Sequence, residues 1–237
     1  MPRYAYERLS ALDNSFLVLE KPNAYMHVSS TMLFEAGPLA TPEGGINAAA
    51  SRQLFAPALN FAPWASFGRM RTVHTNILGF GLGVGAIFGL SYYILMRLTR
   101  RTLLFPKLAR LQLWLFNVGI FLALVTLAMG YTQSLEYAEM EWPLDIAIVI
   151  LWVMFAVNVV GTILVRREEQ MYISLWYIIA TVVGVAVLYI VNNLSIPAGL
   201  LKSYHLFAGV NSANVEWWYG HNAVGFVFTM PILAMFY

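Results

Sequence analysis

Two of the four histidines in this sequence lie where an imidazole could bind a metal within a membrane. His221 follows the aromatic residues 217–219 in a long apolar segment, where an ionisable side chain is costly and marks a candidate functional site. His74 precedes another such segment, and because imidazole suits both copper and iron, we expect metal binding. The alternatives are a histidine bonded to a neighbouring carbonyl, or an anchor at the membrane surface. His27 and His205 lie in polar segments and remain unassigned.

Basic and small residues surround His74. Arg69 and Arg71 precede it and could contact either lipid headgroups or the carboxylates of a bound cofactor. A glycine in a membrane helix lets another body approach closely, whether a neighbouring helix or a flat macrocycle. Glycines recur along the apolar segment that follows, at Gly79, Gly81, Gly83, Gly85 and Gly89.

A group of glutamates, Glu136, Glu139 and Glu141, follows the second apolar segment. Carboxylates suit hard cations such as calcium, so the group is a candidate cation site. Glu136 and Glu139 would share a face if the preceding helix continued that far. For each glutamate taken alone, a solvated loop is the simpler expectation.

The elements that must position these residues are membrane helices. The chain has 237 residues, of which 59% are hydrophobic and 11% charged, whereas a soluble domain usually carries about 25% charged residues. Its mean hydropathy is +0.66. A bilayer core of about 30 Å needs roughly 20 apolar residues in a helix. Runs of this kind predict five transmembrane helices, near residues 76–97, 111–132, 143–165, 171–191 and 217–237.

The charges of the connecting segments predict an orientation. Residues 97–110 and 166–170 are rich in arginine and lysine, whereas residues 133–142 are acidic and residues 192–216 nearly lack basic side chains. The positive-inside rule makes the basic connectors cytoplasmic. Both candidate histidines, and everything before residue 76, then belong to the outer side of the membrane.

Composition also excludes several functions. The chain has no cysteine, which rules out disulfides, iron–sulfur clusters, thiolate haem ligation and cysteine catalysis within it. Its net charge of +2 and the scatter of its basic residues do not favour nucleic-acid binding. The first 30 residues lack the apolar run of a cleavable signal peptide.

Three blocks of sequence resemble subunit I of the cbb3-type cytochrome c oxidases, the haem-copper terminal oxidases of bacterial respiratory membranes. The blocks are LNFAPWASFGRMRTVHTN, GYTQSLEYAEMEWPLDIAI and VEWWYGHNAVGFVFTMPILAMFY, and the resemblance runs from about residue 49 to residue 237. It implies oxygen reduction with electrons from cytochrome c and proton translocation. It also implies a multi-pass protein of the bacterial inner membrane that meets lipid, cytochrome c-type haem subunits and oxygen.

The resemblance assigns four positions of this chain. His74 matches the axial ligand of the low-spin haem b, and His221 matches one of the three copper ligands. Arg71 lies where an arginine contacts the haem propionates, and Glu136 matches a glutamate of the family's calcium site. The implied cofactors are therefore low-spin haem b, high-spin haem b, copper and a calcium ion.

The chain departs from the family pattern in its extent. The family's subunit has twelve transmembrane helices, and its other copper and haem ligands lie after the position that matches Tyr237. Its first transmembrane helix has no counterpart here. Since the chain ends within an apolar run, we expect a truncated subunit that lacks oxidase activity alone.

The N-terminal segment has a different resemblance. Residues 1–47 include RLSALDNSFLVLEKPNAYMHVSSTMLFEAGPLATPEGGI, which is similar to the start of bacterial wax ester synthase/diacylglycerol acyltransferases. Those enzymes use an HHxxxDG motif, and this chain has no adjacent histidine pair. The two joined fragments suggest a fused or misassembled reading frame.

The sequence therefore predicts an all-α membrane protein, a partial haem-copper oxidase subunit I bundle in residues 48–237 behind a short irregular N-terminal segment. Two alternatives remain open. One is an acyltransferase, which the missing motif argues against. The other is a membrane bundle without enzymatic function.

Overall fold

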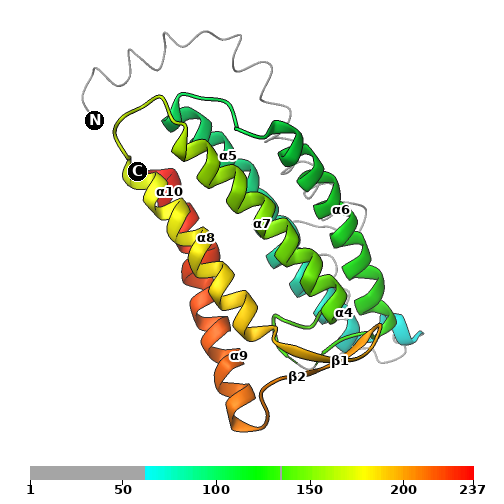
Figure 1. The fold of residues 1–237 in the computed structure, drawn as a ribbon. Coiled ribbons are helices and arrows are strands. Elements are labelled where there is room, and N and C mark those ends of the chain that lie inside the picture. Colours follow the sequence, from blue (N-terminus) through cyan, green and yellow to red (C-terminus); the bar gives the residue numbers. More distant parts are fainter. Residues whose placement is uncertain (1–61, 134) are drawn as a thin grey trace.

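A computed structural model of the chain describes residues 62–133 and 135–237. Within these residues the protein is a bundle of long helices that run alternately up and down (Figure 1). The acyltransferase-like segment predicted for residues 1–47 lies outside the described residues.

Four helices in the described part of the chain are long and apolar enough to cross a membrane. The first is continuous over Phe67–Thr99 and consists of α4 (Phe67–Asn76), a π-helical segment (Ile77–Val84) and α5 (Gly85–Thr99). The others are α6 (Pro106–Met129), α7 (Trp142–Leu164) and α8 (Ile173–Asn192). The prediction of an all-α membrane bundle is confirmed.

The fifth predicted span is helical but is built differently. It consists of α9 (Val210–Ala223), a second π-helical segment (Val224–Thr229) and α10 (Met230–Phe236). It does not count among the helices that are long and apolar enough to span a membrane, because its first half is polar. Figure 1 shows this segment, in orange and red, packed along α8.

The first helix begins at Phe67, well before the apolar run that the sequence analysis placed at residue 76. Tertiary contacts hold its polar first turns. The Nη1 of Arg69 donates a hydrogen bond of 3.1 Å to the carbonyl of Ala128 at the end of α6. A cation at this position also interacts favourably with the C-terminal end of the helix dipole.

Proline and glycine mark the ends of α6. Pro106 is the first residue of the helix, where its missing N–H costs nothing. Gly130 follows the last residue with φ +91°, a left-handed conformation that favours glycine. A side chain at this position would also collide with the Arg69 guanidinium, since an added Cβ would lie 2.8 Å from its Nη2.

Aromatic side chains fill the middle of the bundle. The ring of Phe88 lies 5.7 Å from that of Phe116 and 4.7 Å from that of Phe155, measured between centroids. The two π-helical segments meet beside this core. An added Cβ at Gly83 would lie only 2.7 Å from Cε1 of Phe228, so glycine lets the first and last helices touch.

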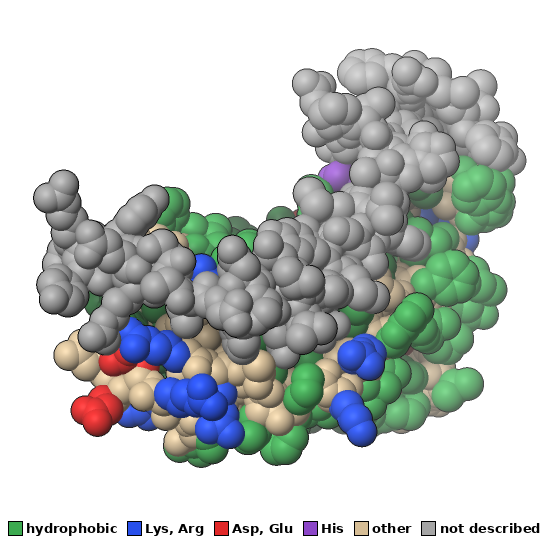
Figure 2. All heavy atoms as spheres, turned by 90° about the horizontal axis from the view of Figure 1, so that it is seen from above, with side chains coloured by type: hydrophobic (Ala, Val, Ile, Leu, Met, Phe, Trp, Pro, Cys, Tyr) green, Lys and Arg blue, Asp and Glu red, His purple; other side chains and the backbone are tan. Residues whose placement is uncertain are grey.

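The two basic connectors lie at one end of the bundle and contact each other. The N–H of Arg167 donates to the carbonyl of Thr99 at 3.0 Å, and Nη1 of Arg101 donates to the carbonyl of Val165 at 3.0 Å. Figure 2 looks onto this end, where lysine and arginine side chains gather in blue.

The acidic connector lies at the opposite end, beside a small hairpin (Figure 1). The hairpin consists of β1 (Ser195–Gly199) and β2 (Lys202–His205), which pair antiparallel with Ser195 opposite His205. The sequence predicted only a connector for these residues. The hairpin adds to the all-α bundle and does not alter its class.

Candidate functional site

Residues 130–141, which we call the acidic loop, join α6 to α7 and contact both helices that carry the candidate histidines. The Arg71 guanidinium on α4 forms an ion pair with the Glu136 carboxylate. The backbone N–H of Glu136 donates to Oε1 of Glu216 on α9 at 2.7 Å. Arg71 and Glu136, which the sequence analysis assigned to a propionate and to calcium, are therefore partners of each other here.

A second pair of contacts also joins the acidic loop to these two helices. Nδ2 of Asn76, two residues after His74, donates to Oε2 of Glu139 at 2.9 Å. The hydroxyl of Tyr219, two residues before His221, donates to the carbonyl of Tyr137 at 3.4 Å. The acidic loop thus contacts residues close to each candidate histidine, and both histidines belong to the same end of the bundle.

The glutamates of the loop differ in their environments. Glu136 is exposed, as expected for a solvated loop, but that expectation is wrong for Glu139 and Glu141, which are 6% and 2% exposed. Burial raises the pKa of the Glu139 carboxyl above its ordinary value of 4.5, against the hydrogen bond from Asn76, which lowers it. Since α6 ends at Met129, Glu136 and Glu139 do not extend a helical face.

His74 and His221 occupy similar local positions. His74 is half-buried on α4, three residues before the segment Ile77–Val84, and His221 is exposed on α9, three residues before the segment Val224–Thr229. π-Helical segments in helices frequently occur at functional sites. Neither imidazole makes a hydrogen bond to a described residue, so each ring nitrogen remains available as a ligand.

His205 is different, because both of its ring nitrogens have partners. Nδ1 lies 2.7 Å from the Ser212 hydroxyl and Nε2 lies 3.1 Å from the carbonyl of Asn192. We infer a structural role for His205. His27 lies outside the described residues.

Each candidate histidine stands alone as a metal ligand. Residues 62–133 and 135–237 contain no group of three or more His, Cys, Asp and Glu side chains that could hold a metal ion. The donor set fits a group that takes one ligand from His74, or one from His221, and its remaining ligands from elsewhere. The four predicted site residues stay predictions.

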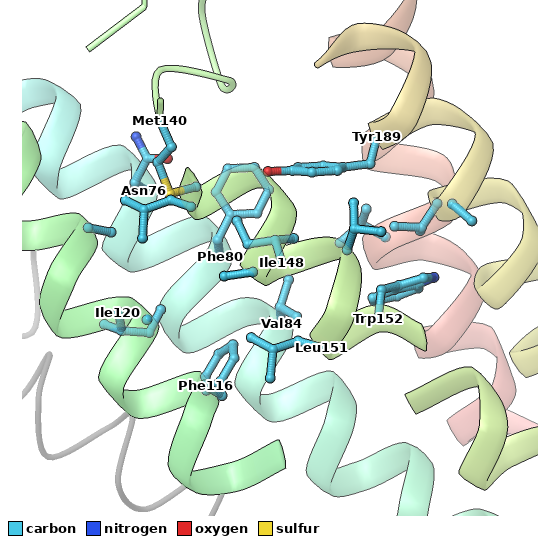
Figure 3. A pocket seen from close by; sticks show the side chains of 18 of the residues that line it. Asn76, Phe80, Val84, Phe116, Ile120, Met140, Ile148, Leu151, Trp152 and Tyr189 are labelled. Carbon is cyan, nitrogen blue, oxygen red and sulfur yellow. The ribbon is translucent and has the colours of Figure 1, made fainter. Parts of the chain in front are cut away.

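An apolar cavity of about 130 Å³ lies between the helices, next to the residues that follow His74. Figure 3 shows Asn76 and Tyr189 at one end of the cavity and Phe116 at the other. The wall also includes Tyr219 and Val227 of the last helix, but neither His74 nor His221.

The glycines after His74 divide into two kinds. Gly81 and Gly83 serve helix packing, since an added Cβ would lie 3.3 Å from Ile120 and 2.7 Å from Phe228 respectively. An added Cβ at Gly79 would meet no described atom within 4 Å. Of these three glycines, Gly79 is therefore the one that leaves clearance for a flat group.

Two contacts of the site were not found by sequence reasoning. Glu216 and Asn76 hold the acidic loop, although the sequence pattern predicted a role for neither. The position of Asn76, two residues after His74, could have indicated its role. Asparagine is common at helix ends for other reasons, so this position alone does not predict the contact with Glu139. The partner of Glu216 lies 80 positions away in the chain, a pairing that no local pattern reveals.

Comparison with known proteins identifies the fold's family. The family model for cytochrome c and quinol oxidase polypeptide I matches residues 32–237. This match begins within the segment that resembles acyltransferases, and the predicted boundary near residue 47 stays a prediction.

Curated relatives agree with the family match. The chain is 46% identical over 194 residues to the cbb3-type cytochrome c oxidase subunit CcoN1 of Stutzerimonas stutzeri. The aligned region covers 81% of this chain and 41% of that relative. It is 42% identical over 187 residues to a cytochrome c oxidase subunit 1 homolog of Agrobacterium tumefaciens (strain T37), covering 78% and 35%. The identity to cytochrome c oxidase subunit 1 of Rhodobacter capsulatus is 38% over 192 residues, and the aligned region covers 78% of this chain and 36% of that relative.

The chain spans between about a third and two fifths of the length of these relatives. The predicted resemblance to cbb3-type subunit I is confirmed by the similarity to CcoN1, and the family match agrees with it. This protein belongs to the cytochrome c and quinol oxidase polypeptide I family.

Proposed function

We propose that this chain provides part of the redox centre of a cbb3-type oxidase, with His74 as an axial ligand of low-spin haem b and His221 as one copper ligand. The observation that carries the proposal is the acidic loop, which contacts residues beside both histidines. Both imidazoles lack hydrogen bonds to described residues, which supports a ligand role because a structural histidine such as His205 uses its ring nitrogens.

The bound cofactors would supply electron transfer and oxygen reduction, and the protein would supply ligation and charge. The Arg71 guanidinium has five N–H donors, so its pairing with Glu136 leaves donors for a haem propionate. The open space beside Gly79 supports clearance for the macrocycle on this helix. The high-spin haem takes no ligand from the residues that we assign.

A calcium ion at Glu136 is a further part of the proposal. The Glu216 carboxylate supports it, because it accepts from the main-chain N–H of Glu136 at 2.7 Å and so places a second acid next to this residue. The Arg71 guanidinium opposes it by occupying the Glu136 carboxylate. Calcium binding would therefore require Arg71 to turn away from Glu136.

The segregation of charge supports the location that we propose. The basic connectors at one end of the bundle would face the cytoplasm, and the acidic loop, with both histidines, would face the periplasm of the bacterial inner membrane. Cytochrome c-type subunits of the complex would then deliver electrons from the side of the acidic loop.

Haem titration of the purified chain in detergent tests the assignment of His74. One axial ligand should give weak haem binding, with a Soret band that is shifted and sharpened relative to free haem in the same detergent. Added imidazole should convert the bound haem to a six-coordinate, low-spin spectrum at a lower concentration than it converts free haem, because one ligand is already in place. His74→Ala should return both the spectrum and the imidazole titration to those of free haem. His221→Ala is the matched control, since it removes an imidazole from the same end of the bundle, and it should retain the shifted band.

Two results would contradict the proposal. If the Soret band does not shift from that of free haem and His74→Ala changes nothing, the bundle without enzymatic function is the better interpretation. If His221→Ala and His74→Ala reduce the shift equally, His74 is not the specific ligand. We also expect no oxygen consumption by the purified chain with reduced cytochrome c, because one copper ligand and one haem ligand do not complete the centre.

A further inference from the structure

A second group of buried acids lies at the same end of the bundle, away from the candidate histidines. Glu141 precedes α7 and Asp145 lies in its first turn. Both are buried, at 2% and 6% exposure. The main-chain N–H of Asp145 donates to the carbonyl of Glu141 at 3.3 Å, so the two residues lie one helical turn apart.

Each carboxylate has one hydrogen bond and one oxygen without a partner. Oγ of Ser203, on β2, donates to Oε2 of Glu141 at 2.7 Å. The hydroxyl of Tyr189, on α8, donates to Oδ1 of Asp145 at 2.8 Å. Oε1 of Glu141 and Oδ2 of Asp145 are buried and make no hydrogen bond within the described residues.

Asn192 adds two more unpartnered atoms. It ends α8, is 0% exposed, and neither Nδ2 nor Oδ1 has a hydrogen-bond partner among the described residues. It lies three residues after Tyr189, so it shares the face of α8 that meets Asp145. The C-terminal end of α8 and the first turn of α7 lie at the same end of the bundle, so Asn192 belongs to the same end as Glu141 and Asp145.

The hairpin closes the group from the other side. Nε2 of His205 lies 3.1 Å from the main-chain oxygen of Asn192. Ser203, two residues earlier, is on the same side of β2 and contacts Glu141. Asn192 is therefore held between the strand that binds Glu141 and the helical face that binds Asp145.

Such an arrangement requires a further partner. Buried polar atoms in proteins are almost always hydrogen-bonded, and buried charges are paired or bind metals. The positive end of the α7 dipole favours acids in this position but leaves both free oxygens unpaired. Two buried like charges on one helical face repel each other unless a positive charge lies between them.

We propose that Glu141, Asp145 and Asn192 bind a divalent cation that prefers oxygen ligands. The carboxylate oxygens Oε1 and Oδ2 would balance its charge, and Oδ1 of Asn192 would provide a neutral ligand. The hydroxyls of Ser203 and Tyr189 orient the two carboxylates through their other oxygens. The negative end of α8, at Asn192, also favours a cation.

Calcium is the cation that fits these ligands. It accepts six to eight oxygen ligands in flexible geometry, including carboxylates and amide carbonyls, whereas magnesium retains several waters and demands near-octahedral geometry. The three side-chain oxygens would provide part of the calcium shell and water the rest, and flexible geometry suits ligands that come from two different helices. The site would tie α7, α8 and the hairpin together, independently of haem and copper.

Calcium binding to the purified chain in detergent tests the proposal. The Glu136→Gln background removes the separate calcium position proposed there. In that background we expect one calcium ion per chain after equilibrium dialysis, and a rise in Tm with calcium relative to EGTA. Magnesium at the same concentration should give a smaller rise. Adding Asp145→Asn or Glu141→Gln should weaken calcium affinity at least tenfold.

The substitutions separate a cation from the other occupants. Asp145→Asn and Glu141→Gln keep the shape of the side chain and remove a buried charge, so both variants should fold, and in EGTA they should be at least as stable as the parent. Asn192→Asp should lower Tm in EGTA and raise calcium affinity. Glu168→Gln, at the opposite end, is the matched control and should change neither value.

The proposal is overturned if the Glu136→Gln chain binds no calcium, which would assign the group to ordered water or a shared proton. It is also overturned if Asp145→Asn retains the full calcium response. A response that disappears with Glu136→Gln alone would assign all calcium binding to Glu136.

Discussion

The two ends of the bundle are held together by different chemistry. At the basic end, Asn158 on α7 is fully buried and bonds the main chain of Phe105 at both of its amide atoms, with distances of 3.1 and 3.0 Å. The hydroxyl of Thr162 accepts from the N–H of Leu104 at 3.0 Å. These bonds join neutral groups, and both amide atoms of Asn158 are used.

At the acidic end, carboxylates make the connections. Glu139, Glu141 and Asp145 each accept from a neutral donor on another element. Buried atoms there remain without hydrogen-bond partners in the described residues, including Oδ1 of Asn76. Two buried atoms at the basic end, Nε of Arg166 and Oγ of Ser174, also lack partners in the described residues, but neither of them is a carboxylate oxygen. The difference is therefore that buried carboxylates connect the elements at the acidic end, whereas amide and hydroxyl groups connect them at the basic end.

Asn158→Ala gives the largest expected effect on this comparison. The substitution leaves the N–H and carbonyl of Phe105 without partners, so we expect a loss of about 3 kcal/mol in the free energy of unfolding. Unfolding in mixed detergent and SDS micelles, followed by circular dichroism, measures it. Asn222→Ala is the control, since Asn222 bonds only within its own helix, to Trp218. Equal effects of the two substitutions would refute the role of Asn158.

Asn76→Ala is the matching test at the acidic end. It removes the amide donor of the buried Glu139 carboxylate, and we expect a loss of about 2 kcal/mol at neutral pH. The loss of stability should be smaller in the Glu139→Gln background, because a hydrogen bond to a neutral amide contributes less than one to a buried carboxylate. A double-mutant cycle from the same unfolding experiment measures this coupling. Strictly additive effects would mean that the 2.9 Å contact contributes nothing.

The pH dependence of stability should differ between the ends. Burial raises the pKa of Glu139 in the folded protein, so the folded state binds more protons than the unfolded state between the ordinary value of 4.5 and the raised value. Stability should fall as pH rises through this window, by at most about 1.4 kcal/mol per pH unit for one proton. Glu139→Gln should reduce this slope, and Glu168→Gln at the basic end should preserve it. An unchanged slope in Glu139→Gln would assign it to another group.

Arg100→Ala gives the smallest expected effect. Arg100 forms a surface ion pair with Glu168 at 3.1 Å, between the two basic connectors. Exposed ion pairs contribute about 0–1 kcal/mol, so the free energy of unfolding should change by less than about 1 kcal/mol, and less still in high salt. A loss as large as that of Asn158→Ala would mean that charge pairing, and not neutral hydrogen bonds, holds the basic end.

The positions of the helices could largely be predicted from the sequence. The cores of α6, α7 and α8 agree with the predicted spans, because a membrane requires long apolar runs that composition reveals directly. The starts were less predictable. α4 and α9 begin at Phe67 and Val210 because contacts with other elements extend each helix into polar sequence.

Sequence alone determined the membrane bundle, the separation of basic and acidic connectors, the family and the two histidines that could bind metals. Each of these depends on composition or on a short run of residues. Tertiary structure decided which acids are buried and what they contact. The sequence context of Glu139 and Glu141 predicts solvated loop residues, but packing buries both of them. The main-chain N–H of Glu136 binds the carboxylate of Glu216, which lies 80 positions further along the chain. Burial and pairing depend on which surfaces meet, and a local pattern of residues does not specify that.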